Sequence, residues 1–187
     1  MAAWSEPHRH YHDPSHLGEC MAFWARWRGE CERAGEVALA LWFHDAVHDP
    51  RDAGNELQSA AWAARSLTRA GTGSDSVQRV HDLVMATRHA ATQELTAAEL
   101  AGSADARLVV DIDLSILGSP AERFECYDQD VRREYAWVPG YRYLAGRARV
   151  LQCFLDRPRL YHGAAAVALL EAQARINLAA ALSWLAE

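Results

Sequence analysis

Apolar residues recur every three or four positions along most of the chain, a spacing that places them on one face of an α-helix. Runs that alternate Val, Ile, Thr or Tyr with polar residues, which are typical of half-buried strands, are missing. Alanine, leucine and arginine dominate instead. The sequence therefore predicts an all-α fold.

Proline and glycine punctuate these periodic segments and predict about eight helices. The breaks fall at Asp13-Pro14, Asp49-Pro50, Gly71-x-Gly73, Ser119-Pro120, Pro139-Gly140 and Gly163. Ser119-Pro120-x-Glu122 reads as a capping box, so we expect Ser119 to cap a helix. The last segment, from Ala164 to Leu185, should be a packing helix without chemistry.

Size and charge limit the domain count and the partners. A chain of 187 residues can bury one substantial core, so we expect a single compact domain over residues 1–187. The net charge is −6 and the arginines are scattered, which argues against a nucleic-acid duplex as partner. The longest apolar stretch, Val37 to Phe43, is too short to cross a bilayer, so we expect a cytoplasmic protein that does not bind a membrane.

The cysteines show no metal-binding or redox motif. All four are too widely spaced for Cys-x-x-Cys pairs: Cys20, Cys31, Cys126 and Cys153. We therefore expect buried free thiols.

A histidine and an aspartate follow the apolar run at residues 37–43. His44 and Asp45 should interrupt a buried helix. Burying a carboxylate beside an imidazole without a partner costs on the order of several kcal/mol, and a divalent cation is one of few partners that offset this cost. A His-Asp hydrogen bond or a helix C-terminal cap would also explain an isolated pair.

A second histidine is expected to face the same core. Asp13 can cap a helix whose first position is Pro14, so His16 falls within the first turn. There it shares a face with Cys20, Phe23 and Trp27. His12 precedes the cap and is a better candidate for the rim of a site, or for a substrate contact, than for a ligand.

Two aspartates lie two residues apart in LVVDIDLSILG, hence on nearly opposite sides of a helix. Asp113 shares its face with Val109, Val110, Ile116 and Leu117. Asp111 shares its face with Arg107, Ser115 and Gly118. The periodicity therefore predicts that Asp113 is buried and needs a partner, and that Asp111 is not.

Three helices thus offer inward groups in the order His, His-Asp, Asp, and this combined pattern resembles the HD superfamily. The resemblance covers most of the chain and extends to small bacterial proteins described as predicted metal-dependent HD phosphohydrolases. It rests on Arg9-x-Tyr11-His12-x-x-x-His16, HDAVHDP at 44–50, Asn55-Glu56-x-x-Ser59-Ala60, Ala86-Thr87-x-His89, DIDLSILG at 111–118, Tyr127 with VRREY at 131–135, and Gly146-Arg147 before VLQCFL. One departure is His48, where the family often has tyrosine.

Residue placement and resemblance together predict a divalent metal ion bound by His16, His44, Asp45 and Asp113. Two neutral imidazoles and two carboxylates roughly neutralise such an ion and leave positions open for water and substrate, so Mn, Fe, Co, Ni or Mg would fit. Structural zinc is disfavoured because it prefers closed sites rich in thiolate or imidazole, and no cysteine lies near these residues in the sequence.

The resemblance implies hydrolysis of a small phosphorylated metabolite or nucleotide by a water molecule that the metal activates. Asp49, expected at the end of the same helix as His44, resembles the second acid that follows the HD motif in the alarmone hydrolases of the superfamily. It would act as general acid or base. A solvated acid before a proline explains Asp49 equally well, and Glu56 is the second candidate for the role.

Four residues are candidates for substrate contacts: His12, Arg88, His89 and Arg132. An arginine can clamp a phosphate with two hydrogen bonds. Arg132 and Arg133 point in different directions, so at most one should enter the cleft. His81 and His89 could instead bind a second metal ion, although a surface position is the simpler explanation for His81.

Two other functions stay open. An HD-type di-iron oxygenase would need His81 or His89 as ligands and bound iron that activates oxygen. A non-catalytic, ligand-binding module would hold a metal ion without turnover. The sequence is also compatible with a homo-oligomer.

Overall fold

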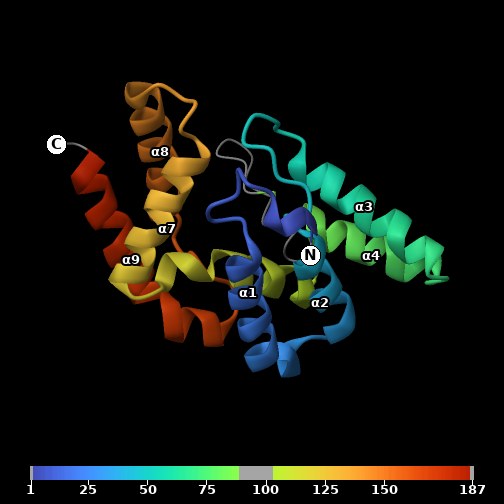
Figure 1. Cartoon of the computed structure of the whole chain (residues 1–187). Coiled ribbons are helices and arrows are strands. Elements are labelled where there is room, and N and C mark those ends of the chain that lie inside the picture. The colour runs from blue at the N-terminus through green and yellow to red at the C-terminus, as the bar shows by residue number, and fades with distance from the viewer. Residues whose placement is uncertain (1, 89–102, 186–187) are drawn as a thin grey trace. The chain divides into compact units, whose positions relative to one another are not determined.

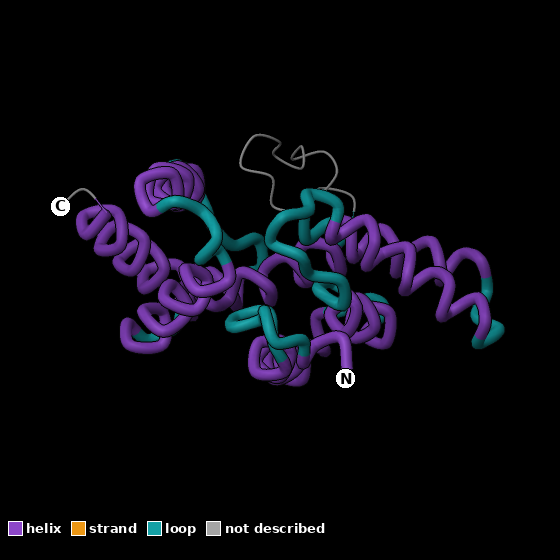
Figure 2. Tube along the Cα trace, turned by 45° about the horizontal axis from the view of Figure 1, so that its top comes forward, coloured by secondary structure: helices purple, strands orange, loops and turns teal. Residues whose placement is uncertain are grey.

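The computed structural model describes residues 2–88 and 103–185, and all regular structure in these ranges is helical (Figures 1 and 2). The prediction of an all-α fold is confirmed. The chain divides into two compact units, Met1–Asp113 and Leu114–Glu187. The prediction that the whole chain is one domain stays a prediction.

The first unit is built around one apolar helix. Its described elements are η1 (Ala2–Ser5), α1 (Pro14–Trp27), η2 (Arg28–Glu30), α2 (Ala34–Phe43), α3 (Asn55–Arg69), α4 (Ser74–Met85) and α6 (Ala104–Asp113). Helix α2 packs against α1, α3, α4 and α6, and Val37, Ala40 and Leu41 on it have no exposed surface. Because four helices enclose α2, the segment that follows its last turn starts inside the core of the first unit.

The second unit contains η3 (Leu114–Gly118), α7 (Ala121–Glu134), α8 (Gly140–Leu155) and α9 (Ala164–Leu185). Helix α9 packs against η3 and α8. The side chain of Asn177 donates hydrogen bonds of 2.8 Å to the backbone carbonyls of Leu117 and Ser119. A Cβ atom at Gly118 would lie 2.6 Å from the Cβ of Leu170, so the close approach of η3 to α9 requires glycine there.

The boundaries follow the punctuation of the sequence. Helices α1, α8 and α9 begin at or directly after the predicted breaks, and Pro50 and Gly71 lie between helices. The capping box at Ser119 is wrong. Pro120 occupies the N-cap position of α7 and no side chain caps it, so Glu122 stands one position too early for the reciprocal bond.

Helix α9 is the one described helix that is long and apolar enough to cross a membrane, with 22 residues and a mean hydropathy of 1.3 in its most apolar window. Core helices of soluble proteins can be as long and apolar, although they are mostly buried and only 28% of the most apolar stretch of α9 is buried. Its polar groups are used inside the second unit: Arg175 donates to the carbonyls of Leu155 and Arg157, and Glu171 accepts from the backbone N–H of Leu160. The evidence for a membrane span is therefore weak.

An ion pair links α2 to α4 in the first unit. Arg79 donates to both carboxylate oxygens of Glu36, each at 2.7 Å. These hydrogen bonds lower the pKa of Glu36 below its ordinary value, although burial opposes the shift. A carboxyl group whose pKa is lowered by folding stabilises the fold above its unfolded-state pKa, and this contribution is lost as the pH falls through the folded-state pKa.

We therefore expect Glu36→Gln to lower the melting temperature at pH 7 and to lose this effect in acid. Thermal unfolding followed by circular dichroism from pH 7 down to pH 3 measures the difference from wild type. The more exposed pair of Arg133 and Asp130, which shares one hydrogen bond between neighbours on α7, offers a control in Asp130→Asn, which should change the melting temperature less at every pH. A deficit of Glu36→Gln that stays constant across this range would contradict the prediction.

Candidate metal centre

The first histidine of the site is fixed by the start of α1. The side chain of Asp13 accepts hydrogen bonds from the backbone N–H groups of Ser15 at 2.7 Å and His16 at 3.2 Å, and Pro14 takes the first helical position. This cap places His16 in the first turn with only 2% of its surface exposed. The predicted cap and the inward direction of His16 are both confirmed.

The second histidine lies at the end of α2. The prediction that His44 and Asp45 interrupt a helix is wrong, because α2 ends at Phe43 and both residues lie in the following turn. His44 is 1% exposed, and its Nδ1 lies 2.7 Å from the backbone oxygen of Leu41. That carbonyl can only accept, so Nδ1 carries the proton and a neutral His44 keeps the lone pair of Nε2 for a ligand.

The two aspartates of α6 are buried differently from the prediction. Asp111 has no exposed surface, whereas the side chain of Asp113 is 14% exposed. The described residues from Leu108 to Gly118 are buried at every position except Asp113. The prediction assumed that only one face of this segment is buried. Because nearly all of the segment is buried, apolar periodicity could not distinguish Asp111 from Asp113.

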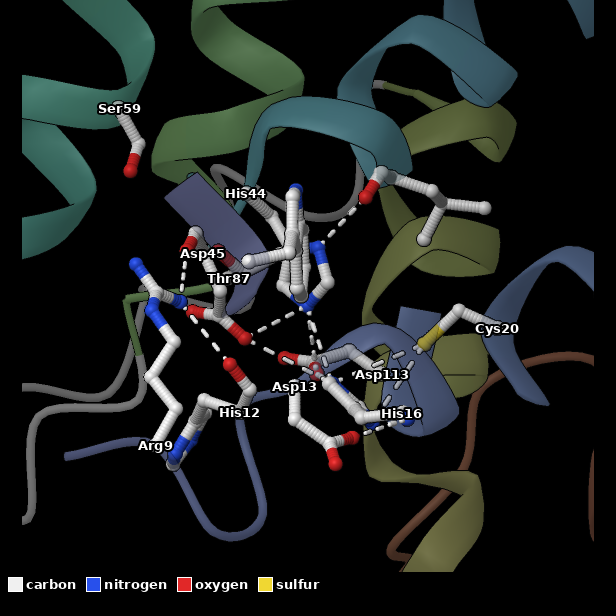
Figure 3. Close-up of polar contacts among 12 residues, drawn as sticks. Arg9, His12, Asp13, His16, Cys20, His44, Asp45, Ser59, Thr87 and Asp113 are labelled. Atoms are coloured by element: carbon white, nitrogen blue, oxygen red, sulfur yellow. Dashed lines mark hydrogen bonds and ion pairs between the residues drawn. The ribbon is translucent and has the colours of Figure 1, made fainter. Parts of the chain in front are cut away.

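Four side chains converge in the first unit (Figure 3). The Nε2 atoms of His16 and His44 are 3.2 Å apart. Asp113 Oδ1 lies 3.4 Å from Nε2 of His16 and 3.3 Å from that of His44. Asp45 Oδ2 lies 2.9 Å from Nε2 of His44 and 3.6 Å from that of His16.

These distances fit a single metal ion. Ligand atoms about 2.1 Å from one ion lie roughly 3.0 Å apart at right angles and about 3.4 Å apart in a tetrahedron. Three of the five separations lie in this range, and the other two, 2.9 and 3.6 Å, lie within 0.2 Å of it. Among the described residues, His16, His44 and Asp113 thus belong to a cluster that could hold a metal ion, with Cys20 as its fourth member. Asp45 joins it through its contacts with both histidines.

The carboxylates determine the charge that the cluster favours. Burial lowers the pKa of His44, but Asp45 and Asp113 outweigh it and hold the pKa well above its ordinary value. The pKa of Asp45 is held well below its usual range because His44 and His12 outweigh the opposing effect of burial. A positive charge between the carboxylates is therefore favoured. A divalent cation would supply this charge in place of the protons that it displaces from the imidazoles.

Cys20 is a neighbour that the sequence argument misjudged. Its buried Sγ lies 3.8 Å from both ring nitrogens of His16, one helical turn earlier. The statement that no cysteine lies near the ligands is wrong, and with it one reason for disfavouring zinc. The four-residue spacing in α1 already placed Cys20 on the same helix face as His16. All four cysteines are free, as predicted, but only Cys20 is buried; Cys126 is exposed.

Neither of the two candidates for proton transfer, Asp49 and Glu56, is fully buried. Asp49 is exposed and belongs to the loop after α2, so its predicted place at the helix end is wrong. One of its carboxylate oxygens accepts the backbone N–H of Arg51 at 2.9 Å. Glu56 is half-buried in the first turn of α3. A role for either residue in proton transfer stays a prediction.

The substrate-contact candidates are spread over both units. His12 is half-buried, and its ring stacks on that of His48 with centroids 3.9 Å apart. Arg88 is exposed just after α4, and His89 lies outside the described residues. Arg132, in the second unit, donates to the backbone oxygen of Tyr135 at 2.7 Å and lies over the ring of Tyr143.

Two further residues behave as the simpler explanations suggested. His81 lies at the surface of α4, where its Nδ1 is 3.1 Å from the carboxylate of its neighbour Asp82. Arg133 is exposed and pairs with Asp130, and its direction differs from that of Arg132.

Comparisons with protein-family models, curated proteins and solved structures found no match for this chain. Membership of the HD superfamily therefore stays a prediction from the motifs. The chemistry of the site is argued below from its own geometry.

The geometry separates the two aspartates of α6 by function. Asp113→Asn should reduce bound metal strongly, because it removes one of two carboxylate charges facing the imidazoles. Asp111→Asn should keep its metal but lower the stability of the fold by ~1–3 kcal/mol, since it changes a fully buried polar group. Elemental analysis and denaturant unfolding of both variants measure these effects. Equal metal loss from both would show that Asp113 has no special role.

Proposed function

We propose that the chain is a metal-dependent phosphohydrolase that acts on a small phosphorylated metabolite or nucleotide. The observation that carries the proposal is the convergence of two imidazole Nε2 atoms and two carboxylate oxygens from three separate segments at separations of 2.9–3.6 Å. The HD-type motif supports the reaction class, and the mixed nitrogen and oxygen donors support a divalent ion.

Exposure of the carboxylates supports catalysis over a purely structural site. His16 and His44 are sealed from solvent, but the side chains of Asp45 and Asp113 keep 16% and 14% of their surface exposed. Solvent can therefore reach the carboxylate side of the cluster. A hydrolytic site needs such access because both water and substrate must enter.

The chain's own residues supply the rest of the proposed chemistry. A divalent ion in this cluster would polarise a phosphoryl oxygen and lower the pKa of a water molecule. Because Nδ1 of His44 donates to Leu41, a bound ion that displaces the Nε2 proton would meet the Nε2 lone pair, and the carboxylates of Asp45 and Asp113 would balance its charge. Asp49, or Glu56 in its place, would exchange a proton with the attacking water or the leaving group.

The test is a turnover screen of the purified full chain. The protein is loaded in turn with Mn, Co, Ni and Mg and assayed for phosphate release from a broad panel of phosphorylated metabolites and nucleotides. We expect turnover of at least one class with wild type and none with Asp45→Ala. Full metal occupancy without turnover of any substrate would favour the non-catalytic module. A mixed-valence iron signal from the iron-loaded protein would favour the di-iron oxygenase.

A further inference from the structure

Arg9 is a buried cation that connects the chain before α1 to the turn carrying His44 and Asp45. Its side chain has no exposed surface. Nη1 donates to the backbone oxygens of His12 at 2.9 Å and Asp45 at 2.7 Å (Figure 3). Nη2 donates to the backbone oxygen of Ala46 at 3.2 Å, and Nε donates to the carboxylate of Glu6 at 3.0 Å.

The position of Arg9 follows from the way α2 ends. The last carbonyl groups of a helix have no partner within the helix, and they carry partial negative charge. Here side chains satisfy two carbonyls of the last turn of α2: the indole of Trp4 donates to the oxygen of Trp42, and His44 to that of Leu41. The carbonyl of Phe43 accepts from the backbone N–H of Ala46. In the turn that follows the helix, one guanidinium group, that of Arg9, satisfies the carbonyls of Asp45 and Ala46.

The same segment also contacts the ring of His44. The ring of Trp4 is 2% exposed, and its centroid lies 5.6 Å from that of His44. The guanidinium of Arg9 in turn lies 5.7 Å from the centroid of the Trp4 ring. Arg9 is therefore tied to both metal-ligand candidates of the turn, by a hydrogen bond to the backbone of Asp45 and by Trp4 to the ring of His44.

We propose that Arg9 is a positioning residue of the metal centre: it fixes the backbone of Asp45 so that the carboxylate and the His44 ring meet the other ligands. The inference rests on the proposed metal centre. Groups that orient metal ligands without touching the ion typically contribute about tenfold to a hundredfold in affinity. Arg9 orients its ligand through backbone carbonyls. Its planar guanidinium carries several N–H donors in a fixed geometry, so that one side chain can donate to the carbonyls of Asp45 and Ala46 together.

The test measures Co²⁺ affinity of the full chain by competition with a chromophoric chelator. Arg9→Met keeps the apolar stem and removes all donors, so we expect Co²⁺ binding to weaken about tenfold to a hundredfold. Arg9→Lys keeps the charge but loses the planar fork, so its loss should be smaller. Arg33→Met is the matched control, because Arg33 is exposed and its guanidinium donates one long hydrogen bond of 3.3 Å to the exposed carboxylate of Glu32.

A second readout separates positioning from general stability. The melting temperature of each metal-free variant, in excess chelator, reports folding alone, and the visible spectrum of the Co²⁺ form reports ligand geometry. If Arg9→Met melts lower but binds Co²⁺ like wild type with an unchanged spectrum, the proposal is overturned. If Arg9→Met does not fold, Arg9→Lys decides by the same criterion. Wild type that binds no Co²⁺ would instead overturn the metal centre itself.

Discussion

His44→Ala and Asp45→Ala are each expected to abolish stoichiometric metal binding and to reduce any turnover to background. His44 supplies an Nε2 whose tautomer is fixed by Leu41, and Asp45 supplies the carboxylate oxygen that lies 2.9 Å from it. Losing either removes one of four groups that surround the ion. The measurement is elemental analysis of protein purified without chelators, together with phosphate release under the conditions of the screen.

A surface His-Asp pair provides the control for this prediction. His81 and Asp82 are adjacent in sequence, like His44 and Asp45, and their side chains lie 3.1 Å apart, against 2.9 Å for His44 and Asp45. His81→Ala and Asp82→Ala should keep wild-type metal content. Retention of metal in both His44→Ala and Asp45→Ala would refute the ligand assignment. Loss of metal in His81→Ala would point instead to a second ion and the oxygenase alternative.

Asp49→Asn is expected to lower turnover by about 10² to 10⁴ while leaving the metal content unchanged. Asparagine keeps the shape and hydrogen-bonding capacity of the side chain but cannot exchange a proton near neutral pH. The local fold should survive, because the side-chain oxygen of asparagine can still accept the hydrogen bond from the backbone N–H of Arg51. Steady-state kinetics with the best substrate of the screen, combined with elemental analysis, measures both quantities.

Glu56→Gln is the paired variant for the proton-transfer role. Glu56 begins α3 and is half-buried, so its replacement should affect turnover less than that of Asp49. Normal turnover of Asp49→Asn would remove Asp49 from the mechanism, and a large loss in Glu56→Gln would transfer the role there. If Asp49→Asn loses its metal, Asp49 supports the ligands and its kinetic effect is not acid-base chemistry.

Local sequence signals predicted the helices and most of the cluster. Asp13 and Pro14 define the start of α1, and this cap alone turns His16 inward. The apolar run before His44 indicated a buried helix, and burial of His44 at its end follows from the packing of α2 against four helices. These signals work because capping and apolar spacing act within one or two turns of the chain.

The remaining features depend on contacts that leave no periodic pattern. Asp111 and Asp113 could not be ranked by burial, because α6 and the following turn are enclosed on nearly all sides. Arg9 could be singled out only by resemblance, since its partners are backbone carbonyls up to 37 residues away, and any residue type carries a carbonyl. Helical spacing did predict that Cys20 shares the face of His16, and the two side chains are in contact.

The ion itself gives the most direct test of the central claim that His16, His44, Asp45 and Asp113 form one metal centre. X-ray absorption of the Co²⁺- or Mn²⁺-loaded full chain, with metal quantified in the same sample, reports both occupancy and ligand type. The geometry predicts about one ion per chain, with nitrogen and oxygen neighbours at about 2.0–2.2 Å and imidazole scattering that disappears in His44→Ala. An ion bound without imidazole neighbours, or no ion bound after loading, would contradict it.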